Sequence, residues 1–167
     1  MKTKLLQSKN KTDIIISDFV KDVLGSNCLE ILLNDNPLLK EKVDISCRKN
    51  MRDFNCYGFV LFYLGLSEKL FYMDETNFME EIKILEKTND FEQGNIFLIS
   101  TKYMGFFNPI HAGVCVDEKN RIVFSKRGLN NFFVESLKRE ELHYLYLMNS
   151  VYRLDNDSKI EFYKLKK

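Results

Sequence analysis

The sequence predicts an α+β domain in which helices come first and an antiparallel sheet follows. Apolar residues recur at helical spacing in several segments up to residue 88, whereas strand-like apolar runs dominate after residue 94. A polar turn at residues 117–120, between two of these runs, indicates a β-hairpin. The length of 167 residues is typical of a single domain.

Helical patterns occur in four segments, which are residues 11–25, 27–41, 56–66 and 76–88. Gly25 is a suitable C-terminal stop for the first pattern, and the second is broken near residues 34–37. The third is almost wholly apolar, so we expect a buried helix with Asp53 or Asn55 as its N-cap. The charged, irregular residues 42–53 are expected to form a loop.

Strand patterns occur at residues 94–100, 111–116, 121–125, 132–135 and 145–154. We expect residues 135–143 to be helical between the last two. The polar residues 155–167 are expected to fray or to form an edge strand. The predicted single domain, residues 1–167, thus has a helical N-terminal extension (1–45), a core (46–154) and a polar tail (155–167).

Composition excludes several classes of function. The net charge of +1 gives no electrostatic basis for binding nucleic acid or an anionic membrane. No segment approaches the roughly 20 apolar residues that span a bilayer, and the N-terminus lacks the apolar stretch of a secretory signal. We therefore expect a cytoplasmic protein, or one exported without a classical signal peptide. Its oligomeric state leaves no mark in the sequence.

The four cysteines, Cys28, Cys47, Cys56 and Cys115, are irregularly spaced and include no CxxC pair. This spacing argues against a zinc site, and a chain of this size without a signal sequence argues against a disulfide framework. We expect no metal and no organic cofactor, so each thiol has to be considered singly.

Cys56 stands at the start of the apolar helix pattern, where the partial positive charge of a helix N-terminus favours a thiolate. Gly58 would allow another segment or a substrate to approach closely. His111 stands at the entry of a strand pattern and is followed by the small residues Ala112 and Gly113, which would leave room for a substrate backbone. A cysteine and a histidine in this order provide a nucleophile and a base. Considered alone, a free cysteine is more often a small buried core residue, and a lone histidine can be a satisfied structural residue; the helix start and Gly58 bring the functional interpretation of Cys56 level with the structural one.

Other polar residues are weaker candidates. His143 is the second possible base, but it lies in a charged run that we expect to be solvated. The group that orients the imidazole is expected on the strand after the hairpin, where Ser125 is the candidate and Lys126 the alternative. Asp117 and Asn120 lie in the turn, too far from the imidazole. The basic pairs 126–127 and 138–139 are expected to form a solvated face.

At these residues the chain resembles the NlpC-type branch of papain-like cysteine peptidases and amidases. The family has Asp-Cys-Ser-Gly at a helix start, Gly-Asp opening a strand, and His-(Val/Ala)-Gly-(Ile/Val) on the next strand, followed by a hairpin. The matching segments here are Asn55-Cys56-Tyr57-Gly58, Gly94-Asn95 and His111-Ala112-Gly113-Val114, and the resemblance covers roughly residues 50–154.

The resemblance implies a papain-like (NlpC-type) core in which Cys56 attacks an amide carbonyl and His111 transfers the proton. The backbone N–H of Cys56 would contribute to the oxyanion site. Asn55, Tyr57 and Gly113, which belong to the matching motifs, are the candidate substrate-binding residues. The family often has a histidine as third member near position 124 or 125, where this chain has none; the run from Ser125 to Gly128 resembles a Ser-Lys-x-Gly variant.

The implied activity is a thiol-dependent hydrolase or acyl transferase, a cysteine peptidase or amidase, acting on a peptide or a cell-wall-like amide. Two alternatives remain open at this point. A glutamine deamidase or toxin-like effector makes the same attack on a side-chain carboxamide. A catalytically weak binding module would retain the fold, and the missing third polar group favours it.

Overall fold

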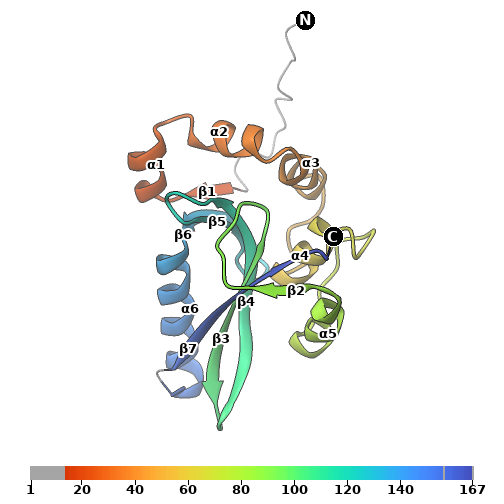
Figure 1. Ribbon diagram of the computed structural model, residues 1–167, viewed down its shortest axis with the longest axis vertical. Coiled ribbons are helices and arrows are strands. Elements are labelled where there is room, and N and C mark those ends of the chain that lie inside the picture. The colour runs from red at the N-terminus through yellow and green to blue at the C-terminus, as the bar shows by residue number, and fades with distance from the viewer. Residues whose placement is uncertain (1–13, 156, 167) are drawn as a thin grey trace, which may run out of the picture.

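A computed structural model describes residues 14–155 and 157–166 of the chain. It has an α+β fold, as predicted, with helices on both faces of a mixed sheet (Figure 1). The helices are α1 (Asp18–Leu24), α2 (Cys28–Asp35), α3 (Pro37–Ser46), α4 (Cys56–Tyr63), α5 (Glu75–Glu81), the 3-10 helix η2 (Ile82–Ile84) and α6 (Leu137–Tyr152). The strands are β1 (Ile14–Ile16), β2 (Glu86–Thr88), β3 (Ile96–Tyr103), β4 (Phe106–Asp117), β5 (Ile122–Lys126), β6 (Phe132–Ser136) and β7 (Ser158–Lys164).

The described strands pair in the order β1-β6-β5-β4-β3-β7-β2. The predicted hairpin is confirmed, because β4 and β5 pair antiparallel with Gly113 opposite Ser125. The prediction of a purely antiparallel sheet is wrong at one edge, where β1 runs parallel to β6. β1 precedes the first helix in the chain and forms the edge of the sheet beside β6.

Strand alternation divides β4 between the two faces of the sheet. Ala112 and Val114 belong to the larger apolar cluster, together with residues of α4. Cys115 belongs to a second cluster on the opposite face, together with Leu137 of α6. Figure 1 shows α6 on one side of the sheet and α4 and α5 on the other. Neighbouring residues of β4 therefore face different helices, and this division controls the geometry of the candidate site.

In the first half of the chain, the main error concerns residues 14–16. They were predicted within a helix over residues 11–25, but they form β1, and residues 11–13 lie outside the described residues. Three consecutive isoleucines are stiff, β-branched residues that favour a strand. Ser17 then caps α1 by accepting a hydrogen bond from the Val20 N–H, and the helix ends at Gly25 (φ 86°) as predicted.

Two boundaries in this half also differ from the prediction. The break expected near residues 34–37 separates α2 from α3, but α3 continues to Ser46, beyond the expected start of a loop at residue 42. Residues 76–88 were predicted as one helix. The structure has the short helix α5, the 3-10 turn η2 and then strand β2, which pairs with β7.

In the second half, residues 145–154 were predicted as a strand but belong to helix α6 as far as Tyr152. Leu137, Glu140 and Tyr144 are the buried residues of α6, and their spacing is helical. The tail was expected to fray or to lie at an edge, whereas β7 is paired on both sides, with β3 and with β2. In the part of the chain that the structure describes, no helix is long and apolar enough to cross a bilayer.

Candidate functional site

Cys56 is the first residue of α4, and Asn55 fixes this helix start. The Asn55 Oδ1 accepts hydrogen bonds from the Gly58 N–H (3.1 Å) and the Met73 N–H (3.3 Å), and its Nδ2 donates to the Met73 carbonyl (2.7 Å). Of the two predicted caps, Asn55 is therefore the one used. Its amide serves to join α4 to the segment before α5, although the residue also lines the pocket that contains Cys56.

Gly58 has the close approach expected from the sequence. A Cβ built at this position would lie 1.8 Å from the Phe71 carbonyl oxygen, a distance that no side chain tolerates. The backbone around Phe71 thus lies directly against the first turn of α4. Substitution of Gly58 would displace this segment, which includes the pocket-lining residue Tyr72.

The Cys56 thiol is buried, with 6% of the residue exposed. Burial raises its pKa from 9.0 to about 12, although the backbone N–H groups of Ala112, Tyr57 and Cys56 and the charge of Lys126 act to lower it. The helix N-terminus therefore stabilises a thiolate, as the sequence predicts, but burial outweighs this effect. Cys56 in this structure is a protonated thiol at neutral pH.

The His111 side chain lies on the opposite face of β4, in register with Ile99 of the second cluster. It is fully buried and stacks on the Tyr144 ring, with ring centroids 3.8 Å apart and an interplanar angle of 13°. Burial, together with the charges of Arg127 and His143, lowers the pKa of His111 well below 6.5. The imidazole is therefore neutral at physiological pH.

Glu140 of α6 is the carboxylate beside this imidazole. Its Oε2 lies 3.5 Å from His111 Nε2, and its Oε1 accepts a hydrogen bond from Arg127 Nη2 at 3.0 Å. Burial raises the pKa of Glu140, while the Arg127 charge opposes that rise. Arg127 and Glu140 thus form a largely buried ion pair beside the His111 imidazole.

Ser125 and Lys126, the two residues predicted to orient the His111 imidazole, lie on opposite faces of the sheet. Ser125 is in register with Gly113 and lies near Glu140, whose pKa it lowers, but its hydroxyl lacks the geometry of a well-formed hydrogen bond. Lys126 lies on the face of α4, with its Nζ 4.8 Å from the centre of the Phe54 ring and 3.0 Å from the Gly128 carbonyl oxygen. Its charge acts on Cys56 rather than on His111.

Cys56 and His111 are close in the chain fold but are not hydrogen-bonded. Neither ring nitrogen of His111 has a hydrogen-bond partner among the described residues, and the Cys56 sulfur instead meets the N–H of Ala112, the next residue along β4. Tyr144 lies between the surroundings of Cys56 and those of His111, because its ring stacks on His111 and the residue also lines the pocket at Cys56. The pairing of β4 with β5 ends at Gly113 and Ser125, just before the loop at residues 127–131 that follows β5.

The pocket at Cys56 has a volume of about 250 Å³. It is lined by Asn55, Cys56, Tyr57, Tyr72, Glu75, Ile110, Gly128, Leu129 and Tyr144. Two of the predicted substrate-binding residues, Asn55 and Tyr57, are thus in its wall. Gly113 is not, because the space beside it is filled by the Phe97 ring (2.5 Å from a built Cβ) and the Phe124 carbonyl (2.6 Å).

Sequence reasoning missed Glu140, Tyr144 and Arg127. Arg127 and Glu140 were assigned to a solvated face, but the Arg127 side chain is only 17% exposed and that of Glu140 is fully buried. The available signal was the helical spacing of Leu137, Glu140 and Tyr144, which places a carboxylate and a phenol on one apolar helix face. His143, the alternative base, contacts the edge of Tyr144 (ring centroids 5.1 Å apart) and does not line the Cys56 pocket.

No group of three metal-binding side chains occurs in residues 14–155 and 157–166. The four cysteines are free thiols. In comparisons with known proteins, no family model, no curated protein and no solved structure matches this chain.

Proposed function

We propose that this protein is a thiol-dependent hydrolase or acyl transferase of the NlpC-type, papain-like kind, which acts on an amide bond with Cys56 as nucleophile and His111 as base. The observation that carries the proposal is the environment of the Cys56 sulfur. It lies at a helix N-terminus, in the wall of a pocket, and receives the backbone N–H groups of Ala112, Tyr57 and Cys56. Such donors stabilise negative charge on a sulfur or on an adjacent oxyanion.

The protonation states set the order of the reaction steps. A neutral imidazole takes the proton from the thiol, and the sulfur attacks the carbonyl carbon to form a C–S bond. The negative charge that develops on the carbonyl oxygen faces backbone N–H groups at the start of α4. Collapse breaks the C–N bond, and the imidazolium gives its proton to the leaving amine. Water, or an acceptor amine in the case of transfer, then attacks the thioester and releases Cys56.

This sequence of steps requires the His111 ring to approach the sulfur when substrate binds. Catalytic hydrogen bonds are often long or misaligned in unliganded enzymes and become shorter in the complex. Tyr144 is the residue that would have to move, since it contacts both His111 and the Cys56 pocket. Glu140, rather than Ser125, is suited to stabilise the imidazolium, because its carboxylate is 3.5 Å from Nε2.

A second candidate, a binding module with little catalytic activity, is favoured by two observations. Burial raises the pKa of Cys56 to about 12, and His111 has no hydrogen bond to the thiol. Under this alternative, the pocket would bind an amide-containing ligand without cleaving it.

Mass spectrometry of a mixed peptide library tests the proposal. The library should include glutamine-containing peptides and cell-wall-like isopeptides and be incubated with the wild-type protein or with Cys56→Ser. We expect new termini, deamidated side chains or transferred acyl groups that appear only with the wild type, and the mass change distinguishes the three reactions. A library left unchanged by the wild-type protein, or changed equally by Cys56→Ser, would overturn the proposal.

A further inference from the structure

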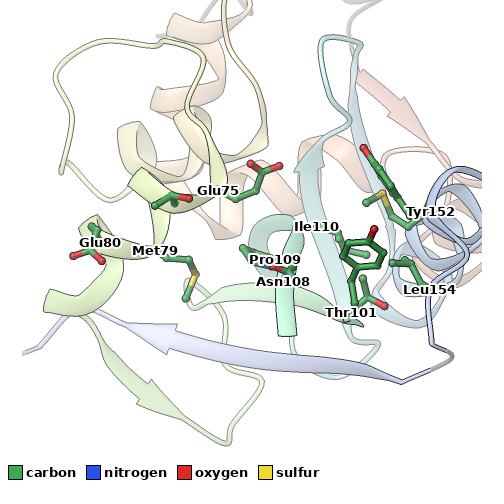
Figure 2. A pocket seen from close by; sticks show the side chains of 12 residues that line it. Glu75, Met79, Glu80, Thr101, Asn108, Pro109, Ile110, Tyr152 and Leu154 are labelled. Carbon is green, nitrogen blue, oxygen red and sulfur yellow. The ribbon is translucent and has the colours of Figure 1, made fainter. Parts of the chain in front are cut away.

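A second, larger cavity adjoins the pocket at Cys56. Its volume is about 490 Å³, and it lies between α5, the β3–β4 hairpin and the C-terminal part of α6. Glu75 and Ile110 line both cavities, so the two adjoin at these residues and together form what we call the groove, with Cys56 at one end. Figure 2 shows Glu75 and Met79 of α5 on one side and Thr101, Tyr152 and Leu154 on the other, with Pro109 between them.

The distal part of the groove is largely apolar. Its apolar lining residues are Met79, Tyr103, Pro109, Ile110, Met148, Tyr152 and Leu154. Ring contact between Tyr103 and Tyr152 (centroids 6.1 Å apart) holds the hairpin against the end of α6. A cavity of this size and composition suits an apolar side chain together with the peptide backbone that carries it.

Glu75 provides the charge at the junction of the two cavities. It is exposed and has no ion pair or hydrogen bond to another side chain within the described part of the chain. The second acidic residue of the groove, Glu80, differs in this respect, because its carboxylate accepts hydrogen bonds from Lys83 at 2.6 Å. No lysine, arginine or histidine of the described residues lines either cavity. Glu75 is therefore an acidic side chain without an ion-pair partner among the described residues, in a groove that no cationic side chain lines, while the charge of Lys126 behind the pocket acts on Cys56.

Tyr144 adds an unused polar group. Its hydroxyl is buried and lacks a hydrogen-bond partner among the described residues, and the residue lines the pocket at Cys56. Buried hydroxyl groups are normally hydrogen-bonded, so this one has the chemistry to bind a polar atom of a ligand. A peptide carbonyl in the pocket would satisfy it.

We infer that the substrate is a peptide with a cationic side chain close to the reacting amide and an apolar side chain beyond it, bound with the cation beside Glu75 and the apolar group between α5 and the β3–β4 hairpin. The orientation along the groove rests on the proposed function, because Cys56 marks the reacting bond. Charge selection by Glu75 can be measured without turnover.

Affinity selection with Cys56→Ala, which cannot form an acyl-enzyme, tests this inference. The immobilised protein is incubated with a library of short random peptides, and retained peptides are sequenced by mass spectrometry. We expect enrichment of lysine or arginine at one position with an apolar residue nearby. In fluorescence anisotropy, replacement of that lysine by glutamine should weaken binding about two- to fivefold, which corresponds to an exposed ion pair.

Two variants of Glu75 and one control variant show whether Glu75 itself, rather than any acidic residue of the groove, selects the cationic side chain. On the Cys56→Ala background, Glu75→Gln should remove the preference for lysine, and Glu75→Lys should shift it toward glutamate. Glu80→Gln is the matched control and should leave the preference unchanged, since Lys83 already neutralises that carboxylate. Retention of no peptides, retention without charge preference, or a preference that persists in Glu75→Lys would overturn the inference. Each of these results can occur while the wild-type protein still modifies peptides, so a failure here is distinct from a failure of the proposed function.

Discussion

Burial governs the protonation of both candidate catalytic residues. His111 is fully buried and its pKa lies well below 6.5, while the pKa of the Cys56 thiol is raised to about 12. Both groups are therefore neutral at pH 7. Nucleophilic attack then requires proton transfer from the thiol to the imidazole, in contrast to thiol enzymes that hold a preformed thiolate.

The lowered pKa of His111 predicts a loss of stability in acid. Below about pH 6.5 the unfolded chain binds a proton at His111 while the native protein does not, so the free energy of unfolding falls as the pH falls. The slope from this residue is at most about 1.4 kcal/mol per pH unit. Urea unfolding of wild type and His111→Gln between pH 5 and pH 8 measures it.

The difference between the two proteins isolates His111, because Glu140 and His143 titrate in both. We expect the wild type to lose stability relative to His111→Gln as the pH falls from 6.5 to 5, and the two curves to run parallel above pH 7. Parallel curves throughout that range would show that His111 takes up its proton equally well in the native state.

At the residue scale, local signals predicted the start of a helix at Cys56 and the residue that caps it. Asn55 before an apolar run predicts a helix start, and the structure confirms the cap. Glu140 and Tyr144 could not be found in this way, because their relation to His111 depends on how α6 packs across the sheet. Periodicity shows which residues share a helix face, but it does not show which strand that face covers.

At the element scale, α6 is held to the end of β5 by the ion pair between Glu140 and Arg127. The Glu140 side chain is fully buried, and Arg127 also lies over the Phe133 ring with its Cζ 3.8 Å from the ring centre. Removal of one partner leaves the other charge poorly solvated. The pair therefore couples the helix that contains Tyr144 to the loop that borders the Cys56 pocket.

Glu140→Gln should lower the free energy of unfolding by about 3 kcal/mol, because it leaves Arg127 without its anionic partner. The double variant Glu140→Leu with Arg127→Leu should be less destabilised than the sum of the two single leucine variants. Glu118→Gln, in the exposed turn between β4 and β5, is the control and should change stability little. Additive effects in urea unfolding of the leucine variants would contradict this coupling.

The element prediction failed where propensity and tertiary structure disagree. Residues 145–154 contain tyrosine and valine, which favour a strand locally, yet α6 buries its face through Leu137, Glu140 and Tyr144. Residues 14–16 were included in a helix, although β1 is stabilised by pairing with β6, more than a hundred residues later in the chain. The three isoleucines favour a strand locally, but a partner strand so far along the chain cannot be identified from local sequence.

On the scale of the whole molecule, β7 joins the C-terminal segment to the sheet as the strand next to the edge strand β2. It pairs with β3 from Thr101↔Ser158 to Ile96↔Tyr163 and with β2 on its other side. Phe162 is buried and packs edge-on against Phe91, with ring centroids 5.7 Å apart. The polar composition of residues 155–167 concealed this role, although Ile160 and Phe162 pack in one apolar cluster and Tyr163 packs against the other.

Deletion of residues 156–167 should therefore disrupt the fold rather than trim a tail. The burial of Phe162 is worth roughly 2 kcal/mol, and the exposed edge of β3 would promote association. We expect loss of cooperative thermal unfolding and aggregates in size-exclusion chromatography. Deletion of residues 165–167 alone is the control and should leave both properties unchanged. A truncated protein that unfolds with the wild-type midpoint would contradict this role of β7.

The division of β4 between two faces also explains why the candidate site is assembled only at one end of the sheet. Cys56 belongs to the cluster on the α4 face of the sheet, whereas His111 is in register with Ile99 of the cluster on the α6 face. The helices of the first half, the strands from β3 to β6 and the hairpin between β4 and β5 were predictable from the sequence, but β1, β2 and the second half of α6 were not. The placement of Cys56 and His111 on opposite faces of the sheet was not predictable either, because it depends on the register of β4 against β3.

The most direct test of Cys56 and His111 as nucleophile and base is the pH dependence of Cys56 acylation by p-nitrophenyl acetate in wild type and His111→Gln. Mass spectrometry of the peptide that carries Cys56 reports the acylation, with buried Cys115 as internal reference. We predict a rate that is constant across neutral pH, falls only in acid well below pH 6.5 where His111 becomes protonated, and is at least about 100-fold lower in His111→Gln. Equal rates in the two proteins, rising with pH as for an isolated thiol with a raised pKa, would contradict the account.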